Sequence, residues 1–236
     1  MRPETLLALK KVSTATLATA LFKRGLRQQY LQNVQPLRVH GQSMVGAAFT
    51  LRYIPAREDL NGIEVFKDPT HPQRRGIEEC PPGHVMVIDS RRDARAASAG
   101  GILVSRLVAR GVAGIVTDGG FRDAQEIAAL NIWAFHQRPS APTNLTLHHA
   151  IALNEPIACG EAPVFPGDIM VGDGDGVICL PAHLADELAD EATEMTAYED
   201  FATERVRHGH TTRGLYPATD TSNLALFATW RNTHGR

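Results

Sequence analysis

The stretch AGGILVSRLVARGVAGIVTDGGFRD, residues 99–123, carries the clearest structural pattern in the chain. Apolar residues recur at helical spacing up to Gly111, which predicts a helix over 99–111 that ends at this glycine. The apolar run over 112–119 then predicts a short strand that is buried on both faces. Two glycines, an arginine and an aspartate follow, so two opposite charges stand side by side where this strand ends.

The neighbouring segments continue this alternation of strand and helix. HVMVIDS (84–90) predicts a buried strand before the quoted stretch, and a helix over 123–131 and a strand over 132–137 follow it. Strands and helices that alternate with short connections are typical of a parallel α/β sheet with right-handed crossovers. Residues 155–181 differ, because Pro-Gly and Gly-Asp-Gly turns separate short β-prone runs, as in an antiparallel set. We therefore expect an α/β fold with one mixed sheet in a single domain.

The remaining segments flank this core. They predict a helix over 4–25 with a break near Ser13, a strand over 46–54, a helix around 63–66 followed by a loop to residue 82, and a long helix over 182–209. The long helix begins with acidic residues and ends with basic ones, which suits the helix dipole. Residues 210–236 show no regular pattern and are expected to be irregular.

Composition excludes several classes of protein. The net charge of −2 over 236 residues gives no electrostatic reason to bind nucleic acid. No run of eighteen apolar residues is present, so no membrane span is expected. Cys80, Cys159 and Cys179 are widely spaced, which is typical of reduced thiols in a cytoplasmic protein.

The charged turn after the strand over 112–119 is a candidate ligand site, since ligands collect at the carboxyl ends of parallel strands. Arg122 offers a planar fork that matches a carboxylate, and Asp123 is an oxygen ligand of the kind that Mg²⁺ or Mn²⁺ takes. The alternative is structural, with Asp123 capping the next helix and Arg122 pairing with Glu126.

A second glycine turn, SAGGILV (98–104), opens the helix over 99–111. The free N–H groups behind Gly100 and Gly101 form an anion site by geometry, although close helix packing explains the same glycines. Both glycine turns are expected at the same edge of the sheet, one strand apart. Together they predict a pocket for a small carboxylate bound to a metal.

At this point the chain resembles the RraA-like family. This family contains the 4-hydroxy-4-methyl-2-oxoglutarate/4-carboxy-4-hydroxy-2-oxoadipate aldolases and the RraA regulators of ribonuclease E activity. The matching pieces are STATLATAL (13–21), MVGAAFTLR (44–52), AGGILVSRLVARGVAGIVTDGGFRD (99–123) and PGDIMVGDGDGVICLP (166–181). The resemblance implies a swivelling β/β/α domain over 1–195, assembled as a homotrimer or a dimer of trimers. Residues 196–236 would be a C-terminal extension that packs on the domain or on a neighbouring subunit.

The resemblance also implies roles for residues of both turns. Asp123 would bind the divalent metal, Arg122 would contact the substrate carboxylate or enolate oxygen, and the N–H groups of Ile102 and Leu103 would contact the pyruvate moiety. Two positions depart from the aldolase pattern, because Gly101 and Thr19 stand where the aldolases carry acidic residues. These departures leave the metal shell and the substrate open.

Cleavage of a carbon–carbon bond beside a 2-oxo acid needs an electron sink, either a lysine Schiff base or a Lewis-acidic metal. None of the four lysines lies near the glycine turns. We therefore predict a divalent-metal-dependent (Mg²⁺ or Mn²⁺) aldolase that releases pyruvate from a small 4-hydroxy-2-oxo acid, with oxaloacetate decarboxylation as a related activity. The alternative is a non-catalytic RraA-type regulator that binds and inhibits ribonuclease E.

A basic segment precedes the second glycine turn. Arg91, Arg92 and Arg95 are expected either at the pocket rim, where they would meet a second carboxylate or a sugar-acid chain, or on a solvated face.

Overall fold

The computed structural model describes residues 2–235, and within this range the chain forms one mixed sheet with two small accessory sheets. The order of the main sheet is β1-β7-β5-β3-β2-β12-β13, with β9 also paired to β2. Its strands are β1 (Gln35–Pro36), β2 (Met44–Pro55), β3 (Val85–Asp89), β5 (Gly114–Thr117), β7 (Trp133–His136), β9 (His148–Leu153), β12 (Ile169–Asp173) and β13 (Gly176–Leu180). The predicted α/β fold with a mixed sheet is confirmed.

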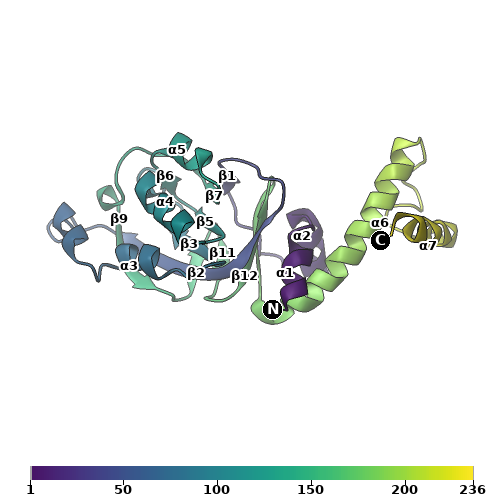
Figure 1. Cartoon of the computed structure of the whole chain (residues 1–236), viewed down its shortest axis with the longest axis horizontal. Coiled ribbons are helices and arrows are strands. Elements are labelled where there is room, and N and C mark those ends of the chain that lie inside the picture. Colours follow the sequence, from purple (N-terminus) through teal and green to yellow (C-terminus); the bar gives the residue numbers. More distant parts are fainter. Residues whose placement is uncertain (1, 236) are drawn as a thin grey trace.

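The accessory sheets and the helices complete the fold (Figure 1). One accessory sheet joins β4 (Ala97–Ala99), β6 (Gly120–Phe121) and β8 (Arg138–Pro139), and the other joins β10 (Ile157–Cys159) and β11 (Ala162–Val164). The α-helices are α1 (Pro3–Leu9), α2 (Thr14–Lys23), α3 (Pro72–Glu79), α4 (Gly101–Ala109), α5 (Ala124–Ala129), α6 (Ala185–Arg207) and α7 (Thr221–His234). Short 3-10 helices are η1 (Ile63–Lys67), η2 (Asn144–Thr146) and η3 (Ala182–Leu184).

The parallel core consists of β2, β3, β5 and β7, as the apolar runs predict. Alternate residues of β3 enter two different apolar clusters, because successive side chains of a strand point to opposite faces. Val85 and Val87 pack on one face, and Met86 and Ile88 pack on the other. The strand is buried throughout for this reason, and α3, α4 and α5 cover one of its faces (Figure 1).

Antiparallel strands include those at the β12–β13 end of the sheet, and β1 and β9 also pair antiparallel with their neighbours. β12 and β13 form a hairpin, β12 pairs antiparallel with β2, and β10 pairs antiparallel with β11, which confirms the prediction for residues 155–181. Helices α1, α2 and α6 pack against β12 and β13 around Leu17, Val171 and Leu188. The predicted break in the first helix is confirmed, because the Ser13 hydroxyl caps α2 by accepting the N–H of Thr16 at 3.0 Å.

Two predictions of irregular structure were wrong. The segment PQRRGIEE forms α3, although it is polar and offers few apolar residues at helical spacing. Residues Thr221–His234 form α7. Asp220 caps this helix, because its side chain accepts the N–H of Ser222 at 2.9 Å. Tertiary packing explains α7, because Phe227 and Trp230 lie against Phe201 of α6.

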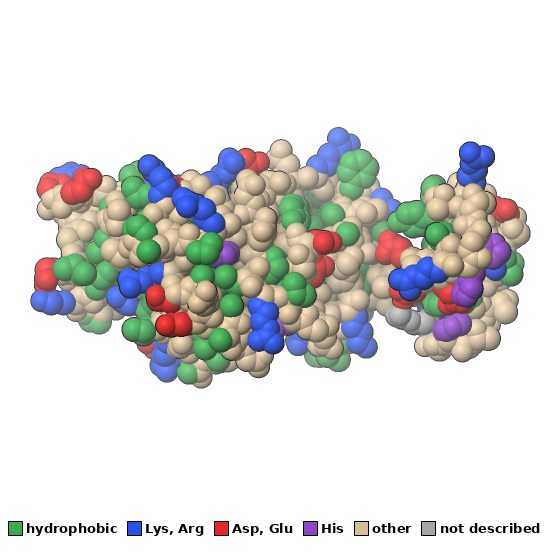
Figure 2. All heavy atoms as spheres, turned by 90° about the horizontal axis from the view of Figure 1, so that it is seen from above, with side chains coloured by type: hydrophobic (Ala, Val, Ile, Leu, Met, Phe, Trp, Pro, Cys, Tyr) green, Lys and Arg blue, Asp and Glu red, His purple; other side chains and the backbone are tan. Residues whose placement is uncertain are grey.

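The distal half of α6 and α7 form an arm that projects away from the sheet (Figure 1). Helix α6 runs unbroken from Ala185 to Arg207, so it connects the sheet to this arm. Figure 2 shows the arm as a lobe joined to the body by a narrow waist. No single helix of the described residues is long and apolar enough to cross a membrane. Helices α1 and α2 taken together have the length and composition of a span, but the chain bends by 113° between them.

The buried side chain of His136 predicts a pH-dependent stability. His136 is 6% exposed, stacks on Phe121, and its Nδ1 has no hydrogen-bond partner among residues 2–235. Burial lowers the pKa of His136 from 6.5 to about 4. Between pH 6.5 and pH 4 the ring of His136 is therefore protonated more readily in the unfolded chain than in the folded one. Its contribution to the free energy of unfolding is present above pH 6.5 and is lost as the pH falls toward 4.

The free energy of unfolding of the wild-type protein should fall between pH 7.5 and pH 5. We expect this fall to be about 2 kcal/mol smaller in His136→Leu. The comparison isolates this ring, since other buried groups titrate alike in both proteins. Urea unfolding at the two pH values measures the difference. An unchanged pH dependence in the variant would contradict the assignment.

Candidate active site

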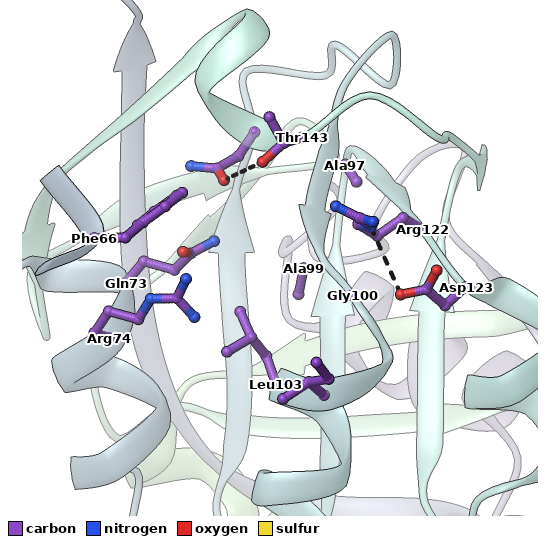
Figure 3. A pocket seen from close by; sticks show the side chains of 12 residues that line it. Phe66, Gln73, Arg74, Ala97, Ala99, Gly100, Leu103, Arg122, Asp123 and Thr143 are labelled. Carbon is purple, nitrogen blue, oxygen red and sulfur yellow. Dashed lines mark hydrogen bonds and ion pairs between the residues drawn. The ribbon is translucent and has the colours of Figure 1, made fainter. Parts of the chain in front are cut away.

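A cavity of about 210 Å³ lies where the two glycine turns meet. Its walls come from η1, α3, β4, the start of α4, the end of β6 and the segment at η2 (Figure 3). Of the predicted site residues, Gly100, Ile102, Leu103, Arg122 and Asp123 line it. Gly101 lies beside it, since its N–H donates to Asp123 Oδ2 at 3.0 Å. The predicted meeting of both turns at one edge is what the structure shows.

A short parallel pairing brings the turns together. β4 pairs with β6 in parallel, and the N–H of Arg122 donates to the carbonyl of Ala99 at 3.1 Å. Each turn follows directly after its strand, so Gly100 and Arg122 leave the same edge of this accessory sheet as neighbours. These strands have two or three residues each, which is too short for a periodicity to reveal them.

The Asp123 carboxylate is held by a neighbouring helix and not by its own. Asp123 has left-handed backbone angles (φ 58°, ψ 37°), and its side chain makes no capping bond to α5. Its Oδ2 accepts the N–H of Gly101, the first residue of α4. Among residues 2–235, Oδ1 has no hydrogen-bond partner, and the side chain is 38% exposed. The alternative in which Asp123 caps the helix that follows it is therefore wrong.

Arg122 lies across the same turn. Its Nε is 3.6 Å from Asp123 Oδ2. Within residues 2–235 Arg122 forms no ion pair with Glu126, so this predicted alternative is also wrong. A Cβ atom at Gly100 would lie 2.7 Å from Arg122 Cγ and 3.0 Å from Asp123 Oδ2. Real Cβ atoms do not approach other atoms at 2.7 Å, so residue 100 must be glycine for Arg122 to lie here.

Position 101 tolerates a side chain better. A Cβ atom there would lie 3.1 Å from Glu126 Oε2 and 3.4 Å from Asp123 Cβ. Glu126 therefore places a carboxylate next to the backbone of Gly101. The sequence gives no sign of this, because Glu126 comes from the following helix and meets Gly101 only in the folded chain.

The first turn of α4 supplies N–H groups at the cavity. The N–H of Val104 is the first to bond back along the helix, to the carbonyl of Gly100 at 3.1 Å. Helix geometry leaves the N–H groups of the preceding residues without partners in the helix, and Gly101 uses its own for Asp123. The N–H groups of Ile102 and Leu103 therefore have no partner within the helix, which is the geometry that can bind an anion.

Buried polar contacts hold α3 against β4 beneath the cavity. Tyr53 donates its hydroxyl to the carbonyl of Ser98 at 2.9 Å, and Gln73 Nε2 lies 2.9 Å from both the Tyr53 hydroxyl and the same carbonyl. Burial raises the pKa of Tyr53, so this hydroxyl stays protonated and keeps its proton for Ser98. The network fixes α3, and with it Arg74, at the cavity wall.

A buried carboxylate orders the loop after β3. Asp118 accepts the N–H groups of Ser90 at 2.7 Å and of Arg92 and Gly160 at 3.2 Å each. Burial raises its pKa to about 6, and nearby Asp89 adds to this effect. Asp118 does not line the cavity, so it supports the shape of the adjoining loops.

The three arginines that were expected either at the rim or on a solvated face do not line the cavity. Arg91 donates to the carbonyl of Leu147 at 3.0 Å, Arg92 pairs with Glu161, and Arg95 pairs with Asp93. The cationic side chains that line the cavity are instead Arg74 and Arg122. Sequence reasoning missed Arg74 because its segment was expected to be a loop.

Neither a lysine nor a multi-residue metal cluster is present at the cavity. Lys23 pairs with Glu191, Lys67 pairs with Glu64, and Lys10 and Lys11 lie at the end of α1. Within residues 2–235, no group of three or more histidine, cysteine, aspartate or glutamate side chains is arranged to hold a metal ion. Any metal here would therefore have few protein ligands.

The chain is similar to proteins of one known family. A family model described as "RraA-like: Aldolase/RraA" matches residues 14–179. A protein of Halalkalibacterium halodurans named "Putative 4-hydroxy-4-methyl-2-oxoglutarate aldolase" is 34% identical over 131 residues, which are 56% of this chain and 61% of that protein. The match thus spans less than two thirds of that relative.

Two solved structures are similar over most of the chain. An uncharacterized protein from Pseudomonas syringae pv. tomato has a TM-score of 0.79 at 24% identity, covering 92% of this chain and 94% of its own. Streptomyces coelicolor RraAS2, described as an unusual member of the RNase ES inhibitor RraA protein family, has a TM-score of 0.76 at 29% identity. That match covers 86% of this chain and 97% of RraAS2.

Proposed function

The chain belongs to the RraA-like family, and from this premise we propose that it is a divalent-metal-dependent aldolase that cleaves a 4-hydroxy-2-oxo acid and releases pyruvate. One observation carries the proposal. Arg122 and Asp123 stand side by side in a cavity at the N-terminus of α4, where free N–H groups face the same space. An anionic substrate and a cation can both be held there.

The residues at Asp123 fit a divalent ion. Gly100 leaves a cradle that a Cβ atom would fill, and Asp123 lies against it with Oδ1 lacking a hydrogen-bond partner within the described chain. A site with one or two carboxylates suits Mg²⁺ or Mn²⁺, which keep several waters. Asp123 would hold the ion, and Glu126, beside Gly101, lies within the same carboxylate-rich corner.

The other residues would act on the substrate. When bound, the ion would supply Lewis acidity at the 2-oxo group. The N–H groups of Ile102 and Leu103 would hold the carboxylate next to that group. As the C3–C4 bond breaks, its electron pair moves toward the 2-oxo oxygen, and the 4-hydroxyl loses its proton to solvent and becomes the carbonyl of the second product. The Arg122 guanidinium would donate hydrogen bonds to the resulting enolate oxygen, and the enolate takes a proton from solvent at C3 to give pyruvate. Decarboxylation of oxaloacetate passes through the same enolate, so the same residues would support it.

No lysine is among the residues that line the cavity, and a Schiff base needs one. This supports a Lewis-acidic metal as the electron sink. The test is pyruvate release from 4-hydroxy-2-oxo acids with Mg²⁺ or Mn²⁺ and with a chelator.

A second function has one observation in its favour. The likeness to RraAS2 extends over 97% of that protein, whose description is that of an RNase ES inhibitor family member. Binding and inhibition of an E-type ribonuclease by this chain would therefore be measured in parallel. Retention of that inhibition by an Asp123→Asn variant would assign it to a surface other than the cavity.

We also propose that the chain assembles as a homotrimer or a dimer of trimers in which residues 196–236 pack on a neighbouring copy. The arm formed by distal α6 and α7 supports this, because it projects from its own sheet (Figure 1). Light scattering with and without residues 210–236 tests it, with a loss of assembly expected on truncation.

The close approach at Gly100 gives a further prediction. The substitution Gly100→Ala would push Arg122 from its place, since the new Cβ would lie 2.7 Å and 2.9 Å from Arg122 Cγ and Cδ. We expect kcat/KM for pyruvate release to fall about tenfold to a hundredfold, because small displacements of catalytic groups are costly.

Gly101→Ala is the matched control, since its closest contact at 3.1 Å is the mobile end of Glu126. We expect it to change kcat/KM by less than about threefold. Equal activity of the two variants would contradict the placement of Arg122. Circular dichroism melting checks that both remain folded.

A further inference from the structure

Two histidines from different elements lie beside each other outside the cavity. His71 directly precedes α3, His149 belongs to β9, and their ring centroids are 5.8 Å apart with the ring planes inclined by 61°. Phe66, which lines the cavity, packs edge-on against His71 at 5.4 Å between ring centroids. Neither histidine lines the cavity itself, so the pair is separate from the candidate active site.

The two rings carry buried nitrogen atoms that lack partners. His71 is 5% exposed, and neither its Nδ1 nor its Nε2 has a hydrogen-bond partner among residues 2–235. His149 is half-buried, and its buried Nδ1 also lacks a partner within this range. A neutral imidazole offers one donor and one acceptor, yet no hydrogen bond joins these neighbouring rings. Buried polar atoms are nearly always paired, and an unpaired group of this kind indicates a bound water or ion.

The surroundings keep the His71 ring neutral, which is the form that binds a metal. Burial lowers the pKa of His71, and nearby His149 and Arg74 lower it further, whereas Asp68 opposes them. A neutral ring keeps a lone pair for a metal ion. Asp68 also supplies a negative charge near the pair, and its Oδ1 is held by the N–H and the hydroxyl of Thr70 at 2.8 Å and 2.7 Å.

The spacing of the rings suits one ion between them. With Zn–N bonds of about 2.0 Å, two imidazoles on one tetrahedral ion have their ring centroids about 5–6 Å apart. The separation of 5.8 Å between His71 and His149 falls in this range. Imidazole nitrogen is a preferred ligand of zinc, whereas Mg²⁺ and Ca²⁺ take oxygen.

We propose that His71 and His149 bind a single Zn²⁺ ion, with water in the remaining coordination positions, at a site separate from Asp123. The ion would join the start of α3 to β9, next to Phe66 of the cavity wall. Permanent zinc sites have three or four protein ligands, so a site with two is expected to exchange its ion with solvent.

Zinc titration of the full-length Asp123→Asn variant tests this site. That variant lacks the carboxylate that would hold the catalytic ion, so the result does not depend on the proposed aldolase function. Isothermal titration calorimetry should show saturable binding of a single Zn²⁺ ion. The melting temperature should rise with zinc concentration, because the ion binds the folded chain more tightly than the unfolded one.

Substitutions in the same Asp123→Asn background identify the ligands. His149→Gln and His71→Gln should each weaken Zn²⁺ binding by about tenfold or more, because each removes one of two ligands. His149→Cys should retain binding, since a thiolate is also a zinc ligand. His208→Gln is the matched control, because His208 is an exposed histidine at the end of α6, and it should leave the affinity within about twofold. Melting temperatures without zinc check that each variant is folded.

Loss of binding in His149→Gln together with its retention in His149→Cys would establish direct ligation. Absence of saturable Zn²⁺ binding by Asp123→Asn would overturn the site. An affinity that His149→Gln leaves unchanged, an equal loss in His149→Gln and His149→Cys, or a loss caused by His208→Gln would each overturn it as well.

Discussion

Asp123→Asn is expected to lower kcat/KM for pyruvate release by about a thousandfold and to weaken Mn²⁺ binding in parallel. Asparagine has the same size and can still accept the N–H of Gly101, which Asp123 accepts at 3.0 Å, so the turn keeps its shape. What is lost is the negative charge that would hold the ion. Coupled assays of pyruvate measure the first effect, and titration of Mn²⁺ by electron paramagnetic resonance measures the second.

Asp220→Asn is the matched control for this change. Asp220 is an aspartate of the projecting arm, where it caps α7, and asparagine is an equally good cap. Activity and Mn²⁺ binding should therefore remain at wild-type values. Full activity of Asp123→Asn would remove Asp123 from the metal site, and lost activity with intact Mn²⁺ binding would give Asp123 another role.

Arg122→Lys is expected to lower kcat by about a hundredfold with a smaller change in KM. Lysine keeps the positive charge but loses the planar fork that donates along two directions. The lost interaction is strongest when charge develops on the 2-oxo oxygen, so the effect should fall mainly on kcat. Steady-state kinetics with saturating Mg²⁺ separates the two constants.

Arg95→Lys provides the comparison for Arg122. Arg95 is an exposed arginine that pairs with Asp93 outside the cavity. Its replacement should alter kcat by less than about twofold. Wild-type kinetics in Arg122→Lys would show that charge alone suffices at this position and would contradict the assigned hydrogen bonds.

The parallel core could be predicted because its signals are local. β3 and β5 are continuous apolar runs, and the sheet buries both of their faces, as the clusters around Val87 and Ile88 show. The turns at Gly100 and Arg122 follow β4 and β6 of an accessory sheet, and these strands come shortly after the core strands β3 and β5 in the chain. The proximity of the two turns then follows from topology.

The rest depends on contacts between distant segments. α3 is stabilised by the buried bonds of Gln73 to Tyr53 and Ser98, and a polar residue with such partners looks like a surface residue in the sequence. Arg74, which lines the cavity, was missed with it. α7 likewise depends on the packing of Trp230 against Phe201.

Pyruvate release by the purified chain tests the central proposal most directly. The substrates are 4-hydroxy-2-oxoglutarate and oxaloacetate, each assayed with Mg²⁺, with Mn²⁺ and with EDTA. We predict turnover that requires the divalent ion, stops with EDTA and returns when the ion is restored. Pyruvate release that is indifferent to EDTA, or no release from either acid with either ion, would contradict the account.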